Sequence, residues 1–316
     1  MLFLLMTLLS LFPQLPTQPA PNTNVVLITL DGVRWQEVFT GTDPVLSQHH
    51  MSARELLPNL YDLFVDHGIA IGQKSPIIAS GPNHISLPGY LEITRGHPST
   101  DCQRNDCYPI IDQSIFQLFD HPVLFSSWDV IARTAPSNID VVINSGRDVR
   151  SESWKRLNLS DNTIFPHTIG APDYRPDIYT EAPVIQYALK YQPDLLWIGL
   201  GDGDEYGHLN NYPEYLASMQ QTDEFIGSLV RWTEQSDYGK NTVFLITADH
   251  GRNANFRDHG TSMVSARVFL LMHGKDIPAK GNIGITRQVS LSNIFPTIED
   301  LAWEVKSSGS IMEYVQ

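Results

Sequence analysis

The sequence has few cysteines, a deficit of basic residues and no long apolar run after its first residues. Two cysteines in 316 residues exclude a fold held together mainly by disulfides. The 21 Lys and Arg residues face 35 Asp and Glu residues, for a formal net charge of −14. This balance argues against bulk binding of nucleic acid, which needs cations along the phosphate backbone. The chain is 42% hydrophobic, without repeats or low-complexity tracts, so it can bury a full core.

The chain begins with an apolar stretch from Leu2 to Phe12, followed by Pro, Gln and Thr residues. This stretch is too short to span a bilayer and resembles a secretory signal, which we place at residues 1–20. The alternative is a buried or membrane-resting N-terminal segment. No later run is long enough for a transmembrane helix, so we expect a secreted or periplasmic protein with no membrane span after the signal.

The two cysteines, Cys102 and Cys107, lie close together in the segment STDCQRNDCYP. In an exported chain, such a pair favours one local disulfide that closes a small loop. The alternative is a pair of free thiols. A metal site is weakly supported, because no further cysteine accompanies them.

Short apolar runs alternate with segments of helical periodicity. The runs cover residues 24–32, 139–146, 193–204, 241–251 and 266–274, and most end in Gly, Asp or His. Residues 51–68 and 212–236 have apolar side chains at helical spacing. This alternation predicts an α/β fold with a doubly wound, mostly parallel sheet flanked by helices. We expect one domain over residues 21–316, with an irregular, lid-like insertion around 97–179.

Carboxylates and imidazoles follow several of these runs, at what would be the carboxyl edge of the sheet. Taken singly, each has a simpler explanation as a turn residue, a helix cap or a surface histidine. Gathered at one edge they would repel each other without a cation, and they are ligands that zinc selects. The sequence therefore predicts two divalent metal ions, with zinc favoured and manganese or another divalent ion also fitting. The candidates are Asp31, Asp202, Asp204, His208, Asp249, His250 and His259.

The ordered motifs LITLDGVRWQEVF, ASGPNH, DEYGH, ITADHGR and DHGT resemble the alkaline phosphatase superfamily. They are most similar to its nucleotide pyrophosphatase/phosphodiesterase branch. The resemblance implies that Ser80 is the nucleophile and that Asn105, some twenty residues beyond it, holds a phosphoryl oxygen. The offset is imperfect, since twenty residues or so after Ser80 falls nearer Asp101. The implied ligands are Asp31, Ser80, Asp249 and His250 for one ion and Asp204, His208 and His259 for the other.

The function expected from this resemblance is that of an exported two-metal hydrolase of phosphate esters. Ser80 would form a phosphoserine, and a small anionic phosphodiester or pyrophosphate is favoured over a monoester. The alternatives are a phosphomonoesterase, a sulfatase-like hydrolase, and a secreted metal-binding protein without catalysis. Sulfatases require Cys/Ser-x-Pro-x-Arg, and His84 stands where the Arg would follow Ser80. Arg34 either steadies the substrate anion or pairs with a surface carboxylate.

Overall fold

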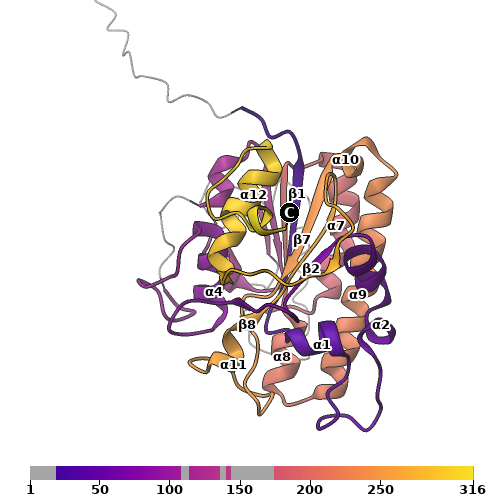
Figure 1. The fold of residues 1–316 in the computed structure, drawn as a ribbon, viewed down its shortest axis with the longest axis vertical. Coiled ribbons are helices and arrows are strands. Elements are labelled where there is room, and N and C mark those ends of the chain that lie inside the picture. The colour runs from indigo at the N-terminus through magenta and orange to yellow at the C-terminus, as the bar shows by residue number, and fades with distance from the viewer. Residues whose placement is uncertain (1–18, 108–113, 136–139, 144–173, 316) are drawn as a thin grey trace, which may run out of the picture.

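An eight-stranded sheet forms the centre of the computed structural model, which describes residues 19–107, 114–135, 140–143 and 174–315 (Figure 1). Its strand order is β10-β2-β9-β7-β1-β6-β4-β5. In that order the strands are β10 (Gly281–Asn282), β2 (Ile69–Ile71), β9 (Leu270–Gly274), β7 (Thr242–Thr247), β1 (Asn24–Leu30), β6 (Leu195–Leu200), β4 (Pro122–Ser126) and β5 (Asp140–Ile143). A second, three-stranded sheet joins β11 (Val289–Ser290), β3 (Ile77–Ile78) and β8 (Arg267–Val268).

The central sheet is mostly parallel, as the sequence predicts. β1 pairs in parallel with β6 on one side and with β7 on the other, and β4 pairs in parallel with β6 and β5. β9 runs antiparallel to both β7 and β2. The carboxyl ends of β1, β6 and β7 therefore meet at one edge, which is where a doubly wound sheet binds ligands.

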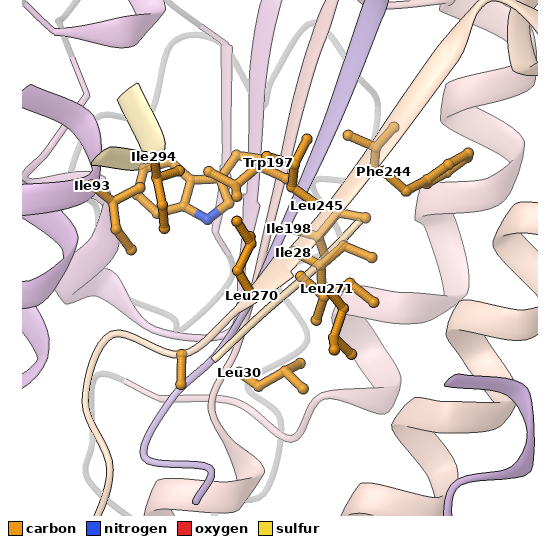
Figure 2. Close-up of a cluster of buried hydrophobic side chains, with 14 of the residues drawn as sticks. Ile28, Leu30, Ile93, Trp197, Ile198, Phe244, Leu245, Leu270, Leu271 and Ile294 are labelled. Carbon is orange, nitrogen blue, oxygen red and sulfur yellow. The ribbon is translucent and has the colours of Figure 1, made fainter. Parts of the chain in front are cut away.

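The middle strands are buried on both faces, which explains their unbroken apolar composition. Every residue of β6 and β7 is buried, as is β1 from Val25 onward. The Trp197 ring of β6 packs against Phe116 and Tyr90, and its Nε1 donates to Thr29 Oγ1 at 2.9 Å. Figure 2 shows this core, with Ile93 and Ile294 on the side of the sheet that carries Trp197.

Helices cover both faces of the sheet. In Figure 1, α4 and α12 lie on one side of the central strands and α9 and α10 on the other. The predicted helix at 212–236 is confirmed as α9, whereas the segment 51–68 breaks into α2, α3 and η1. The helices are α1 (Trp35–Thr40), α2 (Ala53–Leu56), α3 (Pro58–Leu60), η1 (Tyr61–Asp66), α4 (Ser86–Arg95), η2 (Ile115–Leu118), α5 (Asp129–Ala132), α7 (Ile178–Tyr191), α8 (Asp202–His208), α9 (Tyr212–Glu234), α10 (Asp237–Lys240), α11 (Met263–Ala266), η3 (Leu291–Asn293), α12 (Ile294–Trp303) and η4 (Ile311–Tyr314).

The region 97–179, expected to be an irregular insertion, contains two strands of the central sheet. β4 and β5 extend the central sheet beyond β6. The described part of this region therefore contributes edge strands to the sheet in addition to loops. Residues 108–113, 136–139 and 144–173 of it lie outside the described residues, as do residues 1–18 of the predicted signal. Among the described helices, none combines the length and the apolar composition that a membrane span requires.

Candidate active site

The carboxyl edge of the sheet brings the predicted metal ligands together. Asp31 directly follows β1, Asp204 lies on α8 just after β6, and Asp249 and His250 follow β7. These four side chains are almost completely buried. Because β1 lies between β6 and β7, the three strand ends place their acidic residues side by side.

Asp31, Asp249 and His250 form a first candidate ligand group. His250 Nε2 lies 3.4 Å from Asp31 Oδ1 and 3.3 Å from Asp249 Oδ2. Within the described part of the chain, neither Asp249 Oδ2 nor His250 Nε2 has a hydrogen-bond partner, although both are buried. Burial, reinforced by neighbouring carboxylates, raises the pKa of Asp31 and of Asp249 well above the ordinary value. Buried, unpartnered ligand atoms and carboxylates that repel each other are what a cation would satisfy.

Asp204, His208 and His259 form a second group at the adjoining strand end. His208 Nε2 is 3.1 Å from Asp204 Oδ2, and His259 Nε2 is 3.6 Å from Asp204 Oδ1. The two imidazole Nε2 atoms are 3.0 Å apart. Asp204 and His208 are four residues apart on α8, so both side chains project from one helix face. His259 also comes near His250, whose ring it stacks on at a centroid distance of 3.9 Å.

The histidine rings are oriented by backbone carbonyls. His250 Nδ1 lies 2.9 Å from Gly251 O, and His259 Nδ1 lies 3.0 Å from His84 O. A carbonyl can only accept, so each Nδ1 carries the proton and each Nε2 keeps a lone pair for a ligand. Burial also lowers the pKa of both rings, which favours their neutral, metal-binding form. The donors present therefore fit two divalent cations held by oxygen and imidazole nitrogen.

Asp202, the rival ligand in the same loop, faces away from these groups. Its Oδ1 accepts from Asp177 N at 3.0 Å, and Asp177 in turn accepts from the backbone of Gly201 and Asp202. These reciprocal hydrogen bonds hold the backbone at the start of α8. Asp202 thus has a structural partner, and Asp204 is the carboxylate that meets the histidines.

Ser80, the predicted nucleophile, belongs to neither of the two ligand groups. It is exposed, and its hydroxyl and amide both donate to Glu92, at 2.5 and 2.8 Å. Glu92 also accepts from the amide and hydroxyl of Ser292. Ser80 therefore serves to tie the loop before α4 to that helix and to η3.

Ser86 is the serine that the fold brings to the site. It is completely buried at the first position of α4, and its hydroxyl donates to Asp31 Oδ1 at 3.4 Å. Tyr90, one turn later, donates to Asp31 Oδ2 at 2.7 Å. At Gly89 a Cβ atom would overlap the backbone carbonyl of Asp249. The glycine thus lets α4 approach the end of β7 closely enough to present Ser86.

The sequence contained a signal for Ser86. Two Ser-x-Pro triplets occur, at Ser80-Gly-Pro and at Ser86-Leu-Pro. The prediction rests on the first, which Asn-His follows, and does not consider the second. Asn105 lies 19 residues after Ser86 and further from Ser80. Its separation from Ser86 is therefore the one nearer to the expected offset of about twenty residues. His84, which marked the first triplet, instead helps to orient His259 through its carbonyl.

Asn105 lies at the N-terminus of α4, the helix end that also carries Ser86. Its Oδ1 accepts from Leu87 N at 2.9 Å, and Leu87 directly follows Ser86. The predicted disulfide between Cys102 and Cys107 is confirmed, with a Cα–Cα distance of 5.9 Å, and it closes the loop that carries Asn105.

The two buried arginines beside the site are both paired with carboxylates. Arg34 binds Glu37 and lies 3.1 Å from Asp43, so it is engaged with a buried carboxylate rather than a surface one. Arg252 binds Asp204 Oδ1, and this pair holds the pKa of Asp204 well below its ordinary value against the opposing effect of burial. Arg252 was not among the predicted site residues.

Solved structures share this architecture at low sequence identity. A protein of the alkaline phosphatase superfamily from Vibrio parahaemolyticus matches with a TM-score of 0.59 and 16% identity, over 90% of this chain and 67% of that one. The phosphonate monoester hydrolase of Agrobacterium radiobacter matches with a TM-score of 0.58 and 14% identity, over 88% and 73%. This is the alkaline phosphatase fold.

Sequence comparisons connect part of this alkaline phosphatase fold to sulfatases. The family model described as Sulfatase matches residues 153–305, just under half of the chain. Arylsulfatase K of Canis lupus familiaris is 35% identical over 92 residues, and that of Homo sapiens is 33% identical over 92 residues. Each match covers 28% of this chain and only 17% of the relative. The comparisons support the superfamily, and within it they lie closer to sulfatases than to the nucleotide pyrophosphatase/phosphodiesterase branch.

Proposed function

We propose that this protein is a metal-dependent hydrolase of phosphate esters in which Ser86 is the attacking group. The observation that carries the proposal is the position of the Ser86 hydroxyl, 3.4 Å from Asp31 of the buried ligand group Asp31, Asp249 and His250. The first cation would be held by Asp31, Ser86, Asp249 and His250, and the second by Asp204, His208 and His259. Zinc suits these donors, and manganese or another divalent ion would also fit.

The bound cations would supply a lowered pKa at the serine hydroxyl and positive charge at the phosphoryl oxygens. Ser86 contributes a fixed nucleophile at the N-terminal end of a ten-residue helix, where the aligned peptide dipoles favour negative charge. Its attack on phosphorus would expel the alcohol and leave a phosphoserine, which water then hydrolyses. Asn105 contributes an amide at the same helix end.

The charges around the site favour a substrate with one negative charge at phosphorus. A monoester dianion needs an extra cationic side chain for its third free oxygen. Among the described residues, the buried guanidinium groups of Arg34 and Arg252 are both engaged by carboxylates. We therefore favour a phosphodiester or pyrophosphate, as in the nucleotide pyrophosphatase/phosphodiesterase branch, over a phosphomonoester.

A sulfatase-like hydrolase is the second candidate, supported by the family match over residues 153–305. Ser86-Leu-Pro-Gly-Tyr has the Ser-x-Pro spacing of the sulfatase motif, with Tyr90 where that motif has Arg. The residue change argues against sulfatase chemistry, because an Arg cation is replaced by a neutral phenol.

Export is also part of the proposal, supported by the disulfide, which persists in oxidising compartments.

The test compares purified wild-type protein with Ser86→Ala and Ser80→Ala on a chromogenic diester, monoester and sulfate ester. We expect the diester to be hydrolysed fastest, and Ser86→Ala to lose at least about 10³-fold in kcat because the nucleophile is absent. Ser80→Ala should keep activity within several-fold. Equal loss in both variants, or none in Ser86→Ala, would overturn the assignment.

Chelation gives an independent check of the metal requirement. Dialysis against a strong chelator should abolish hydrolysis, and zinc or manganese should restore it. Activity that survives complete removal of metal, verified by elemental analysis, would exclude the metal-dependent mechanism. A folded, metal-binding protein that hydrolyses none of the three esters would favour the alternative of a secreted binding protein.

A further inference from the structure

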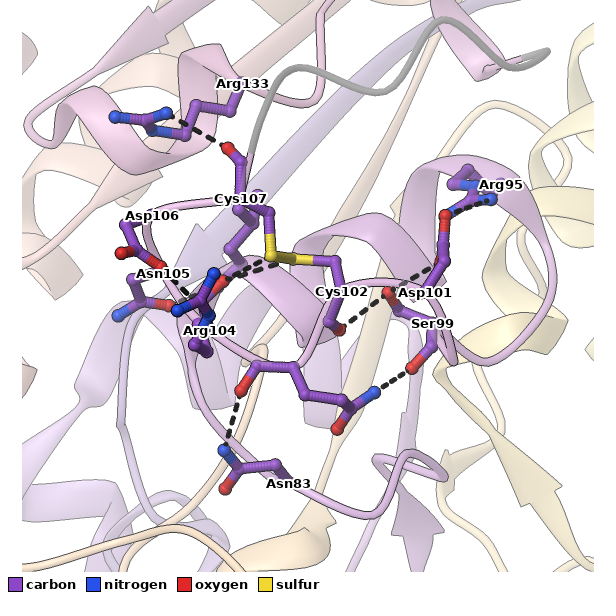
Figure 3. Close-up of a disulfide and its surroundings, with 12 residues drawn as sticks. Asn83, Arg95, Ser99, Asp101, Cys102, Arg104, Asn105, Asp106, Cys107 and Arg133 are labelled. Carbon is purple, nitrogen blue, oxygen red and sulfur yellow. Dashed lines mark hydrogen bonds and ion pairs between the residues drawn. A yellow bond between two sulfur atoms is a disulfide. The ribbon is translucent and has the colours of Figure 1, made fainter.

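Figure 3 shows the loop closed by Cys102 and Cys107, with Asn105 between them. Asn105 contacts Leu87, the residue after the proposed nucleophile, at the N-terminus of α4. Cys102 is buried at 1% exposure, whereas Arg104 and Asp106 are exposed. Between them, Asn105 turns inward and accepts the Leu87 amide at 2.9 Å. The one inward polar contact at the tip of this loop therefore falls on the residue next to Ser86.

Few other contacts fix the loop. None of residues 103–107 forms a backbone–backbone hydrogen bond to the described chain outside the loop. Its side-chain attachments run from Asn83 Nδ2 to Gln103 O and from Arg133 Nη1 to Cys107 O, each 3.0 Å long. Ser99 adds two more, because its hydroxyl donates to Cys102 O and its carbonyl accepts from Gln103 Nε2. The covalent link between the two ends acts together with these bonds to restrain where Asn105 sits.

The hydrogen bond from the Leu87 amide also shows which atom of the Asn105 side-chain amide is available to another partner. Leu87 N–H is a donor, so the atom that faces it must be the carbonyl oxygen of the side chain. The Nδ2 group makes no hydrogen bond within the described residues, and it can donate to an anion at the helix end. Both the amide orientation and the first turn of α4 depend on the same bond.

We propose that the Cys102–Cys107 disulfide is a redox-sensitive positioning element of the active site. The oxidised loop holds Asn105 on the Leu87 amide and thereby fixes Ser86, and reduction releases both. The catalytic part of this inference rests on the proposed function. In the chemical step, a dithiol reductant such as dithiothreitol gives two electrons and two protons to the S–S bond, forms two thiols and becomes a cyclic disulfide.

The experiment measures amide hydrogen exchange of the peptide around residues 85–92, together with diester hydrolysis, on the full metal-loaded protein. The samples are the wild type with and without dithiothreitol, the double variant Cys102→Ser/Cys107→Ser, Asn105→Ala and Asn105→Asp. Asn105→Ala tests the contact with the disulfide intact. Asp106→Asn is the matched control, since within the described residues its carboxylate pairs only with exposed Arg104 in the same loop.

Reduction, the double serine variant and Asn105→Ala should all speed exchange at the start of α4 and lower kcat by about tenfold or more, with little change in KM. Asn105→Asp keeps an oxygen for Leu87, so exchange should stay slow while kcat falls, because the amide donor is lost. Asp106→Asn should match the wild type, and reoxidation should restore the reduced protein.

Exchange at the start of α4 that is unchanged after complete reduction, with the far-ultraviolet spectrum showing an intact fold, would overturn the proposal. The same holds if Asn105→Ala leaves exchange unchanged. If no ester is hydrolysed by any sample, the proposed function fails, and the exchange data still decide whether the disulfide positions α4.

Discussion

At the scale of single residues, Tyr90 decides how Asp31 presents its carboxylate. The phenol is fully buried, packs edge-on against Trp197 and donates to Asp31 Oδ2 at 2.7 Å. Burial and the adjoining carboxylates raise the pKa of Tyr90 well above its ordinary value, so it remains a donor. Oδ1 of Asp31 is left to face Ser86 and His250.

Removing this donor should weaken the first metal site. We expect Tyr90→Phe to reduce metal affinity by roughly tenfold, since partners that orient a ligand commonly contribute 10- to 100-fold. Competition with a chromophoric chelator measures it. Tyr238→Phe is the control, because that hydroxyl donates to Pro193 O at 3.0 Å without touching any proposed ligand. Equal affinities in Tyr90→Phe and Tyr238→Phe would refute the role.

At the scale of elements, the approach of α4 to the end of β7 assembles the site. Gly89 allows the contact with Asp249, and Ile93 continues the same helix into the core shared with α12 (Figure 2). The helix thereby carries Ser86 and Tyr90 to Asp31, and Glu92 to Ser80.

Adding one methyl group at this contact should separate the elements. We expect Gly89→Ala to destabilise the protein by about 1–3 kcal/mol and to reduce activity, because the Cβ would overlap the Asp249 carbonyl. Gly81→Ala is the control, since the nearest atom to its Cβ would be 3.8 Å away. Urea unfolding compares the two, and a Gly89→Ala variant as stable as Gly81→Ala would contradict the close packing.

At the scale of the whole molecule, several acidic side chains are buried although they do not belong to the proposed metal ligands. Glu181 of α7 is 5% exposed, and its Oε1 has no hydrogen-bond partner among the residues that the structure describes. Burial, followed by the charge of Asp177, raises the pKa of Glu181 to about 8, against a hydrogen bond from Gln221 that lowers it. The folded state thus retains a proton that the unfolded chain has already released near pH 5.

Stability should therefore fall as pH rises from about 4.5 toward 8, because over that range the folded protein binds more protons than the unfolded chain. Glu181→Gln removes this titration. We expect the variant to unfold at a higher temperature than the wild type at pH 8 and at a similar temperature near pH 4.5. Calorimetry across this range measures it, and parallel pH profiles for the two proteins would exclude the effect.

Metal binding should stabilise the whole fold, since the ligand groups exist only when the strand ends are assembled. At a free metal concentration 100 times the Kd, linkage adds about 2.7 kcal/mol. Thermal unfolding should shift downward on chelation and recover when zinc or manganese is returned. An unchanged Tm would mean that these side chains hold no cation.

The amino-acid pattern was sufficient to predict the sheet and most of the candidate ligand groups. Strands buried on both faces are recognisable from unbroken apolar runs, and ligands that directly follow a strand, such as Asp31 and Asp249, are fixed by that strand's end. Asp204 and His208 share a helix face, so their local spacing was also sufficient.

The contact between Ser86 and the candidate ligands, by contrast, depends on how distant elements pack. Ser80 and Ser86 have the same local Ser-x-Pro pattern, and the choice depends on where α4 begins and on how closely Gly89 packs against Asp249. The pairing of Arg34 with Glu37 and of Arg252 with Asp204 was equally hidden, because these contacts depend on side-chain packing rather than on residue type. Local spacing fixes which side chains share a face, whereas contacts between elements depend on how those faces pack.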